Sequence, residues 1–349
     1  MKDWKSTLIS PSTAVLEVIK LIDSSGLQIS LVVDEKGRLL GTVTDGDIRR
    51  AIVKGVKFDV PVTKVMNENP TVSRSRDDLE GNMKLMKSQL LHHLPVVDSQ
   101  KIVVGLLTLE DFTLDSNQDN WVVLMAGGLG SRLHPLTKDC PKPMIQVGEK
   151  PILEIILENC IASGLRKFFI SLNYKADVIK QYFKNGEKWG VEIQYLHEEE
   201  RMGTAGSISL LPERPGKAFV VMNCDLITNV DLRNVMRFHQ QENVRATMCV
   251  REYHFQVPYG VVETKGMRII NINEKPLQRF FINAGIYVLE PEVLDLAQPK
   301  TFIDMTEVFK KLIVKNESTA VFPVLEYWLD VGQIGDLRQA SQDIKNKKF

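Results

Sequence analysis

Two stretches of the chain differ in the spacing of their apolar positions. In the first, short strands and helices recur at a constant offset, so that Val33 corresponds to Val97 and Thr44 to Thr108. In the second, apolar strands alternate with amphipathic helical stretches, which is typical of a mostly parallel α/β sheet. The elements expected there cover 121–126, 152–163, 167–172, 192–197, 218–223, 231–242 and 247–251, with a charged terminal helix at 336–348.

A polar segment without hydrophobic periodicity, residues 112–120, separates the two stretches. Domain boundaries fall in such segments, because few contacts cross them. We therefore predict a first domain at 1–115, made of repeats at about 1–56 and 60–115, and an α/β domain at 119–349.

Each repeat has the same order of predicted elements: a helix, a strand, a turn, a second strand and a closing helix. In the first repeat these are marked by 15–24, Gly37 and Asp47, and in the second by 79–89, Ser99 and Asp111. Two copies predict a pseudo-symmetric pair.

The second strand of each repeat ends in Gly-x-x-Thr-x-x-Asp, at Gly41–Asp47 and Gly105–Asp111. These residues resemble the tandem cystathionine-β-synthase (CBS) module, an α+β domain, over about residues 4–115. The resemblance implies that an adenine nucleotide is held by Thr44, Asp47, Thr108 and Asp111. The same residue types are favoured helix N-caps, so capping without a ligand is an equal alternative.

Charge and cysteine usage narrow the class of protein. The chain has 44 basic and 44 acidic residues, which gives no reason to expect nucleic acid or an anionic membrane as a partner. Its apolar runs are much shorter than the roughly 20 residues of a membrane span, and the first residues lack a signal-peptide core, so we expect a cytoplasmic protein. The four scattered cysteines suggest buried reduced thiols rather than zinc ligands or disulfides.

A glycine-rich segment follows the first strand of the α/β domain. Glycines at a strand end let backbone N–H groups approach a phosphate chain, and Arg132 and Lys142 add positive charge. A dinucleotide fingerprint fails because Leu133 occupies the third glycine position, and no Walker A motif occurs.

The segment Ala126–Met144 resembles the signature of the sugar-1-phosphate nucleotidyltransferases, which have a Rossmann-like α/β fold. The likeness extends to the C-terminus through Gly203–Gly206, Asn223–Asp225, Tyr259–Val262, Glu274–Pro276, Asn283–Tyr287 and Trp328–Gly332.

The resemblance implies a role for each matching residue. The catalytic residues are Arg132, Lys142 and Lys275, and Lys275 holds the sugar phosphate. The nucleotide is bound by Ala126, Gly127, Gly128, Gly130, Ser131, Gly203, Thr204 and Asn223. The sugar is contacted by Gly260, Glu274 and Asn283. Mg²⁺ is held by Asp225 and Asp330, which both follow apolar strands and offer the oxygen ligands that this ion prefers.

Three polar positions call for separate comment. Cys224 replaces the glycine that usually precedes the metal-binding aspartate, and His134 stands where arginine is frequent. Cys224 leaves Asp225 in place, whereas His134 removes a permanent charge near the triphosphate, which we expect to weaken nucleotide binding. We expect His197 to lie on a solvated edge with its glutamate neighbours at 198–200.

The implied reaction is in-line attack of a sugar 1-phosphate on the α-phosphate of a nucleoside triphosphate, with release of pyrophosphate. The combination with CBS repeats resembles bacterial guanylyltransferases of legionaminic-acid pathways, which implies GTP and glucosamine 1-phosphate in a homodimer or higher homo-oligomer. Mannose 1-phosphate or a heptose 1-phosphate is the nearest alternative. A non-catalytic nucleotide-binding regulator is the alternative from another class.

Overall fold

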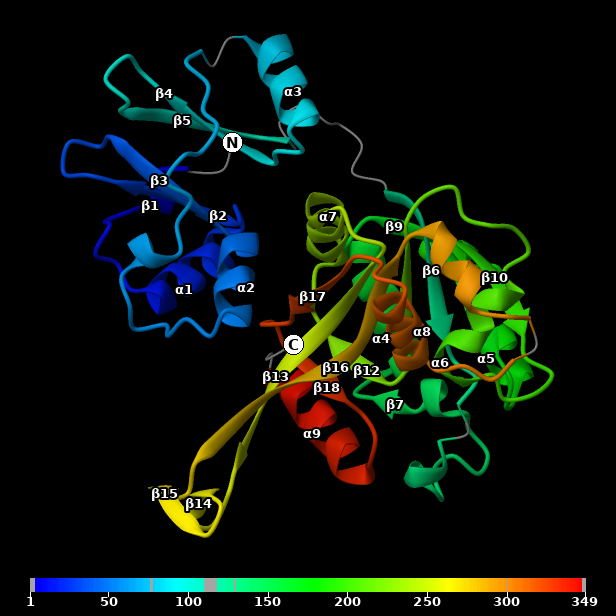
Figure 1. Ribbon diagram of the computed structural model, residues 1–349. Helices are drawn as coiled ribbons and strands as arrows, with labels where there is room; N and C mark the ends of the chain where they lie inside the picture. The colour runs from blue at the N-terminus through cyan, green and yellow to red at the C-terminus, as the bar shows by residue number, and fades with distance from the viewer. Residues whose placement is uncertain (1–3, 76–77, 110–117, 129, 300, 347–349) are drawn as a thin grey trace. The chain divides into compact units, whose positions relative to one another are not determined.

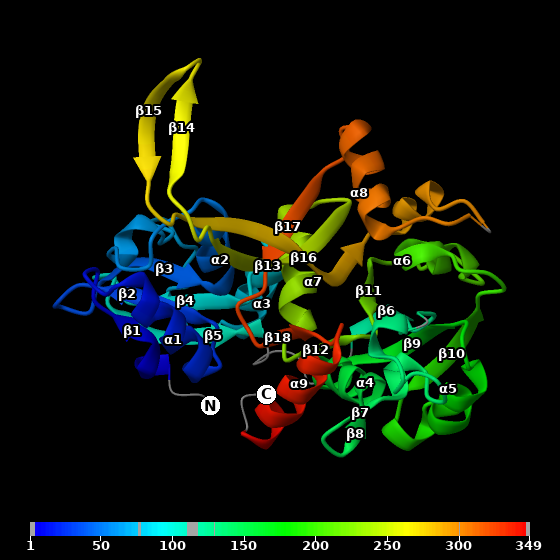
Figure 2. The ribbon, with the colours of Figure 1, turned by 90° about the horizontal axis from the view of Figure 1, so that it is seen from below.

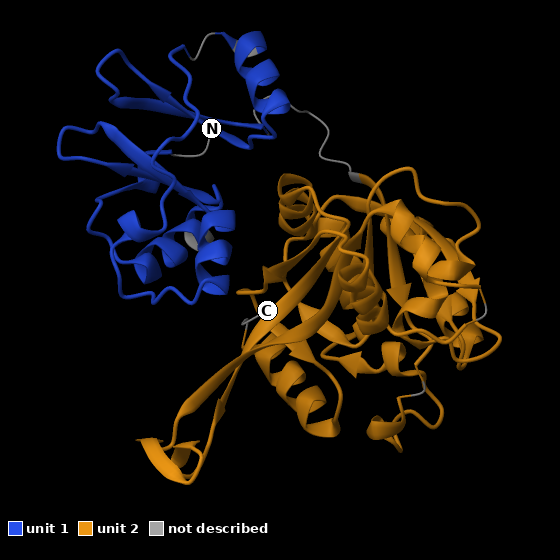
Figure 3. Cartoon of the chain, in the orientation of Figure 1, with its two compact units in different colours: residues 1–116 blue, residues 117–349 orange. Residues whose placement is uncertain are grey.

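The computed structural model describes residues 4–75, 78–109, 118–128, 130–299 and 301–346. The chain forms two compact units, residues 1–116 and 117–349 (Figure 3). In the described part of the chain, no helix combines the length and apolar character needed to cross a membrane.

The N-terminal unit contains two copies of a helix followed by a two-stranded hairpin (Figure 1). The elements of the first copy are β1 (Leu8–Ile9), α1 (Val15–Ser25), β2 (Ile29–Val33), β3 (Leu39–Thr44) and α2 (Asp45–Val53), and those of the second are α3 (Leu79–Ser88), β4 (His93–Val97) and β5 (Val103–Thr108). Both hairpins are antiparallel and irregular at the same place, before Val33 and before Val97. In both turns a carboxylate, of Asp34 or Asp98, accepts two backbone hydrogen bonds. The sequence repeat is therefore a structural repeat.

The two repeats share apolar packing. Ile29 and Leu31 of the first hairpin belong to one buried cluster with Val97 and Leu106 of the second. The closing helix predicted near Asp111 lies outside the described residues.

The C-terminal unit is organised around a seven-stranded sheet in the order β10-β9-β6-β11-β16-β13-β17. Its strands are β6 (Gln118–Met125), β9 (Leu165–Leu172), β10 (Glu192–His197), β11 (Phe219–Asn223), β13 (Ala246–Gln256), β16 (Leu277–Leu289) and β17 (Thr319–Pro323). The first four strands in that order are parallel, and β16 runs antiparallel to both of its neighbours. The predicted mixed, mostly parallel α/β sheet is confirmed.

Helices cover both faces of this sheet. Successive residues of β6 alternate between two buried clusters: Val122 and Leu124 face one, and Val123 faces the other. Burial on both faces is typical of parallel strands. The first cluster includes α4 (Ile152–Ala162), α5 (Ala176–Phe183), α7 (Leu232–Glu242) and α9 (Ile334–Lys345), and the second includes α8 (Met305–Val314).

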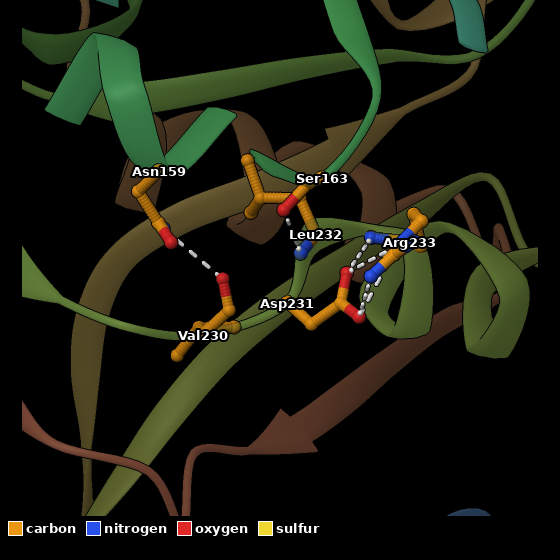
Figure 4. Close-up of polar contacts among 6 residues, drawn as sticks. All are labelled: Asn159, Ser163, Val230, Asp231, Leu232 and Arg233. Carbon is orange, nitrogen blue, oxygen red and sulfur yellow. Dashed lines mark hydrogen bonds and ion pairs between the residues drawn. The ribbon is translucent and has the colours of Figure 1, made fainter. Parts of the chain in front are cut away.

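Polar contacts fix the segment that leads into α7 against the end of α4 (Figure 4). The side chain of Asn159 donates a hydrogen bond to Val230 O (3.1 Å), and Leu232 N donates to Ser163 Oγ (3.0 Å). Asp231 caps α7 through the backbone N–H of Arg233. These contacts hold the turn just beyond the short strand β12 (Leu226–Thr228), which pairs with β18 (Trp328–Asp330).

A long arm leaves the sheet. The outer halves of β13 and β16, residues 251–256 and 277–282, pair with one another beyond the last residues that pair with β17 and β11. The arm ends in a second hairpin, β14 (Val261–Lys265) and β15 (Arg268–Asn273). Figures 1 and 2 show it in yellow, extending away from the seven-stranded sheet in both views.

Candidate active site

A cavity of about 340 Å³ lies at the carboxyl ends of the parallel strands. Ligands bind at this edge in α/β sheets, because the loops there come together. The predicted catalytic, nucleotide-binding and metal-binding residues that line the cavity are Ala126, Gly127, Gly128, Lys142, Gly203, Thr204, Asn223 and Asp225. Segments far apart in the sequence therefore meet at one site.

Glu198 faces the start of the glycine-rich loop inside this cavity. It follows directly after β10, and only 6% of its surface is exposed. A methyl group at Gly127 would lie 2.9 Å from Glu198 Oε1, so a side chain there would displace the carboxylate. Burial raises the pKa of Glu198, while hydrogen bonds from Ser171 and the Met202 backbone act in the opposite direction.

This position corrects one expectation. His197 is exposed, as predicted, but the prediction that its neighbour Glu198 is solvated is wrong. Glu198 comes one residue after a parallel strand, and the same strand-end rule that singled out Asp225 applies to it. Glu198 was predicted to be solvated because it precedes two further acidic residues, Glu199 and Glu200, which are exposed.

The loop at Gly203 is held from the other side of the cavity by Asp304. Asp304 Oδ1 accepts hydrogen bonds from Thr204 N (2.8 Å) and Thr204 Oγ1 (3.1 Å). Gly203 has φ +79°, and a methyl group there would lie 2.6 Å from Ile303 O. Asp304 lies 100 residues beyond Thr204, and no local sequence motif predicted this contact.

Lys142 and Asp225 form an ion pair of 2.7 Å between Nζ and Oδ2. Lys142 is 9% exposed, and Gly130 lets it approach, since a methyl group at Gly130 would lie 2.9 Å from Lys142 Cβ. Gly130 also has φ +64°, a conformation that favours glycine. Ser131 follows it in an exposed 3₁₀ turn.

Backbone pairing brings the second carboxylate beside the first. Leu226 of β12 pairs with Asp330 of β18, and Val331 N donates a hydrogen bond of 2.8 Å to Asp225 O. Burial and then the Asp225 carboxylate raise the pKa of Asp330, whereas Lys142 and Arg132 act in the opposite direction. The two predicted metal ligands therefore interact electrostatically.

These two carboxylates suit a magnesium ion. Asp225 Oδ1 and Asp330 Oδ1 are both buried without a hydrogen-bond partner in the described structure. Buried oxygens rarely remain unpaired, and an unpaired one calls for an ion or water. Magnesium is commonly held by one or two carboxylates together with water and substrate phosphates, which agrees with this pair.

Arg132 reaches the same region. A methyl group at Gly332 would lie 3.6 Å from Arg132 Nη1 and 3.7 Å from Asp330 Oδ1. The Arg132 guanidinium is thus close to the carboxylate pair. Arg132 is an exposed residue and is not among the described residues that line the cavity. His134, two residues later, is also exposed.

Asn223 is positioned by the strand beside it. A methyl group at Gly285 would lie 2.8 Å from Asn223 Nδ2, and Gly285 has φ +71°. Asn283 Oδ1 accepts a hydrogen bond from Gly285 N, and its amide donates to the Tyr287 hydroxyl. Cys224 is a buried free thiol in the cavity lining, and Asp225 keeps its ion pair despite this substitution.

Three predicted acceptor residues lie elsewhere. Gly260, Glu274 and Lys275 are exposed residues of the arm and do not line the cavity. Glu274 approaches Gly260, where a methyl group would lie 2.8 Å from Glu274 Oε2. The structure of one chain therefore separates these residues from the predicted nucleotide site.

In the CBS unit, Thr44 and Asp47 form a capping box at the start of α2. Asp47 Oδ2 accepts from Thr44 N and Oγ1, and Arg50 donates to Asp47 Oδ1 (2.8 Å). Thr44 and Asp47 therefore cap α2, a role that is compatible with nucleotide binding as well. Thr108 ends β5, and Asp111 lies outside the described residues.

Known proteins are similar to part of this chain. A mannose-1-phosphate guanyltransferase of Yarrowia lipolytica is 34% identical over 222 residues, which are 61% of this chain and 61% of that protein. The mannose-1-phosphate guanylyltransferase catalytic subunit beta of Drosophila melanogaster is 34% identical over 223 residues, 61% of this chain and 60% of that protein. The match thus spans less than two thirds of these relatives.

The structure of HddC from Yersinia pseudotuberculosis has the same fold, with a TM-score of 0.52 and 24% identity over 64% of this chain and 99% of that chain. Residues 5–54 and 62–114 match the CBS domain, and residues 121–347 match the nucleotidyl transferase family. Because that family match covers well over half of the chain, the protein belongs to the nucleotidyl transferase family and carries two N-terminal CBS domains.

Proposed function

We propose that this protein is a sugar-1-phosphate guanylyltransferase, which transfers GMP from GTP to a sugar 1-phosphate and releases pyrophosphate. The observation that carries the proposal is the buried Glu198 carboxylate facing Gly127 in the cavity. A carboxylate accepts hydrogen bonds, and guanine presents its N1–H and 2-amino donors side by side. Adenine and cytosine present an acceptor at the corresponding ring nitrogen, and uracil and thymine present a single N–H between two carbonyl acceptors. Glu198 therefore favours guanine, which offers two adjacent donors.

The phosphate chain is assigned to the region of the glycine-rich loop and the carboxylate pair. Lys142 and Arg132 place positive charge near the Asp225–Asp330 pair, and the Gly127–Gly128 backbone offers N–H donors. A magnesium ion bound by these carboxylates would neutralise charge on the transferring phosphoryl group. The sugar phosphate is already an anion, so the protein needs to supply orientation and charge compensation rather than a base.

The sugar is a second question. The sequence resemblance to legionaminic-acid-pathway enzymes favours glucosamine 1-phosphate, and the names of the Yarrowia and Drosophila relatives favour mannose 1-phosphate. We propose glucosamine 1-phosphate, to be contacted by Asn283, Glu274 and Gly260, with Lys275 on its phosphate.

The free thiols support a cytoplasmic, reducing setting.

A substrate panel tests the proposal: four nucleoside triphosphates against glucosamine, mannose and heptose 1-phosphates, with magnesium and pyrophosphate release as the readout. The expected result is release with GTP and one sugar. Release with another nucleotide only would contradict the base assignment. Tight binding of GTP and sugar phosphate without release would instead identify a nucleotide-binding regulator.

For the CBS unit we infer adenine-nucleotide binding in the region of Thr44 and Thr108. The support is the structural repeat of the two hairpins, which ends each second strand on a threonine. Calorimetric titration with AMP and ATP tests this. Because Asp47 also caps α2, a loss of binding in Asp47→Asn counts only if its melting temperature stays within a few degrees of the wild type.

A further inference from the structure

The arm of β13 to β16 exposes apolar surface that a stable fold normally covers. Residues opposite one another in an antiparallel pair share a face, so Tyr253 and Phe280 lie together, and Phe255 follows on the same face. These three residues are 50%, 53% and 49% exposed. Further along the arm, Ile269, Ile270 and Ile272 of β15 are about 60% exposed.

The backbone of the arm is also open. Beyond Val250 the strand β13 has left β17, and before Ile286 the strand β16 has left β11, so the described arm is a two-stranded ribbon with two free edges. An isolated two-stranded hairpin is marginally stable in water, and free apolar edges invite pairing. The arm therefore offers open strand edges and apolar side chains to a partner.

The arm also carries what the cavity lacks. Of the described residues that line the cavity, the cations are Lys142, which is paired with Asp225, and the exposed Arg201. Lys275 lies at the far end of the ribbon. Asn283, near the cavity residue Asn223, is separated from Leu277 by six residues of extended strand, or about 20 Å. This distance exceeds the length of a lysine side chain.

The geometry points to an exchange of arms between two copies of this chain, in which the arm of one copy covers the cavity of the other and brings its Lys275, Glu274 and Gly260 there. Identical elements exchanged about a two-fold axis cover both arms and complete both sites. The cavity offers a seat, because Phe302 in its lining is 63% exposed. The inference rests on the proposed function for the role of Lys275.

A complementation experiment tests the exchange. One chain carries Lys275→Ala and the other Arg132→Ala, both at exposed positions, so folding should be unaffected. The two are co-expressed with different tags, and mixed assemblies are isolated with both tags. If arms are exchanged, the intact arm of one chain serves the intact body of the other, and mixed dimers show about half the wild-type turnover.

If the arm instead folds onto its own chain, each site keeps one defect and the mixed assemblies are as inactive as the single variants. That result, or the absence of any mixed assembly, overturns the exchange. An inactive wild type with every substrate would instead count against the proposed function.

A second measurement does not depend on activity. A photo-crosslinking benzoylphenylalanine replaces Phe280 on the arm or, as a control, the 82% exposed Val314 on α8. Exchange predicts a covalent dimer for the Phe280 variant, joined to the partner's peptide that contains Phe302, and none for the control. A crosslink only within one chain would contradict it.

Discussion

The Nζ atom of Lys142 lies 2.7 Å from Oδ2 of Asp225, a residue 83 positions later in the chain. The pair connects the segment after the glycine-rich loop to the end of β11, at the cavity edge. It also places one positive charge beside two carboxylates, since Asp225 interacts with Asp330. The nucleotide site and the predicted metal site therefore share a residue pair.

Replacing Lys142 tests this connection. Lys142→Met keeps most of the side-chain volume and removes the charge beside Asp225, so we expect kcat to fall by about 100-fold or more. Steady-state pyrophosphate release measures this, with Lys138→Met at a nearby exposed position as the control. Near-normal turnover in Lys142→Met would remove the lysine from the phosphate site.

The base assignment depends on Glu198. In Glu198→Gln one carboxylate oxygen becomes an amide donor facing the guanine donors, so kcat/KM for GTP relative to UTP should fall about 10- to 100-fold, which corresponds to about 1.4–2.8 kcal/mol. The exposed Glu199→Gln variant is the matched control. An unchanged GTP to UTP ratio in Glu198→Gln would mean that another group reads the base.

The unpaired oxygens of Asp225 and Asp330 predict a divalent-metal site. We expect chelation to abolish turnover and added Mg²⁺ to restore it. Binding of Mn²⁺, followed by electron paramagnetic resonance, should weaken about 10-fold or more in Asp330→Asn, because a ligand charge is lost. Asp295→Asn changes an exposed carboxylate away from the site and should leave the affinity unaltered. Equal Mn²⁺ affinity in both variants would contradict the assignment.

Gly190 and Gly285 both have a positive φ, but only Gly285 is packed against another side chain. Replacing each by alanine therefore distinguishes the cost of backbone strain from the cost of a steric clash. Gly190→Ala, at φ +66° with nothing within 4 Å, should cost about 1 kcal/mol of unfolding free energy. Gly285→Ala adds a methyl group 2.8 Å from Asn223 Nδ2, so we expect about 3 kcal/mol and a loss of turnover as Asn223 is displaced. Urea unfolding measures both. An equal loss of unfolding free energy in the two variants would show that Asn223 moves aside without an energetic penalty.

Acid stability should depend on His239. This residue is 1% exposed, its Nδ1 lies 2.8 Å from Thr247 Oγ1, and burial lowers its pKa below 6.5 despite the opposing effect of Glu290. The folded state therefore favours neutral histidine, and its stabilisation is present above about pH 6.5 and is lost as the pH falls through the folded pKa. The unfolding free energy should drop less between pH 7 and pH 5 in His239→Gln than in the wild type.

The exposed His197→Gln variant should retain the wild-type pH dependence. If His239→Gln and wild type lose stability equally between pH 7 and pH 5, protonation of another group governs the acid response.

The strand-end positions were predictable because a parallel sheet brings the carboxyl ends of its strands to one edge. The glycine-rich loop and Asp225 were found in this way, Lys142 and Asn223 came from the family resemblance, and residues of all four line the cavity. The repeat of the CBS unit was equally readable, because the offset of 64 residues recurs in the pairing of Ile29 with Thr44 and of His93 with Thr108.

Sequence alone thus determined the fold class, the family resemblance and the local loop chemistry, since these depend on periodicity and on neighbouring residues. Only the tertiary structure decided which distant groups meet. Glu198 is buried against Gly127, and Asp304 holds Thr204, because the strands and loops that carry them pack together. The course of β13 and β16 likewise places Lys275 on an arm, since strand pairing, rather than a motif, determines where a side chain lies.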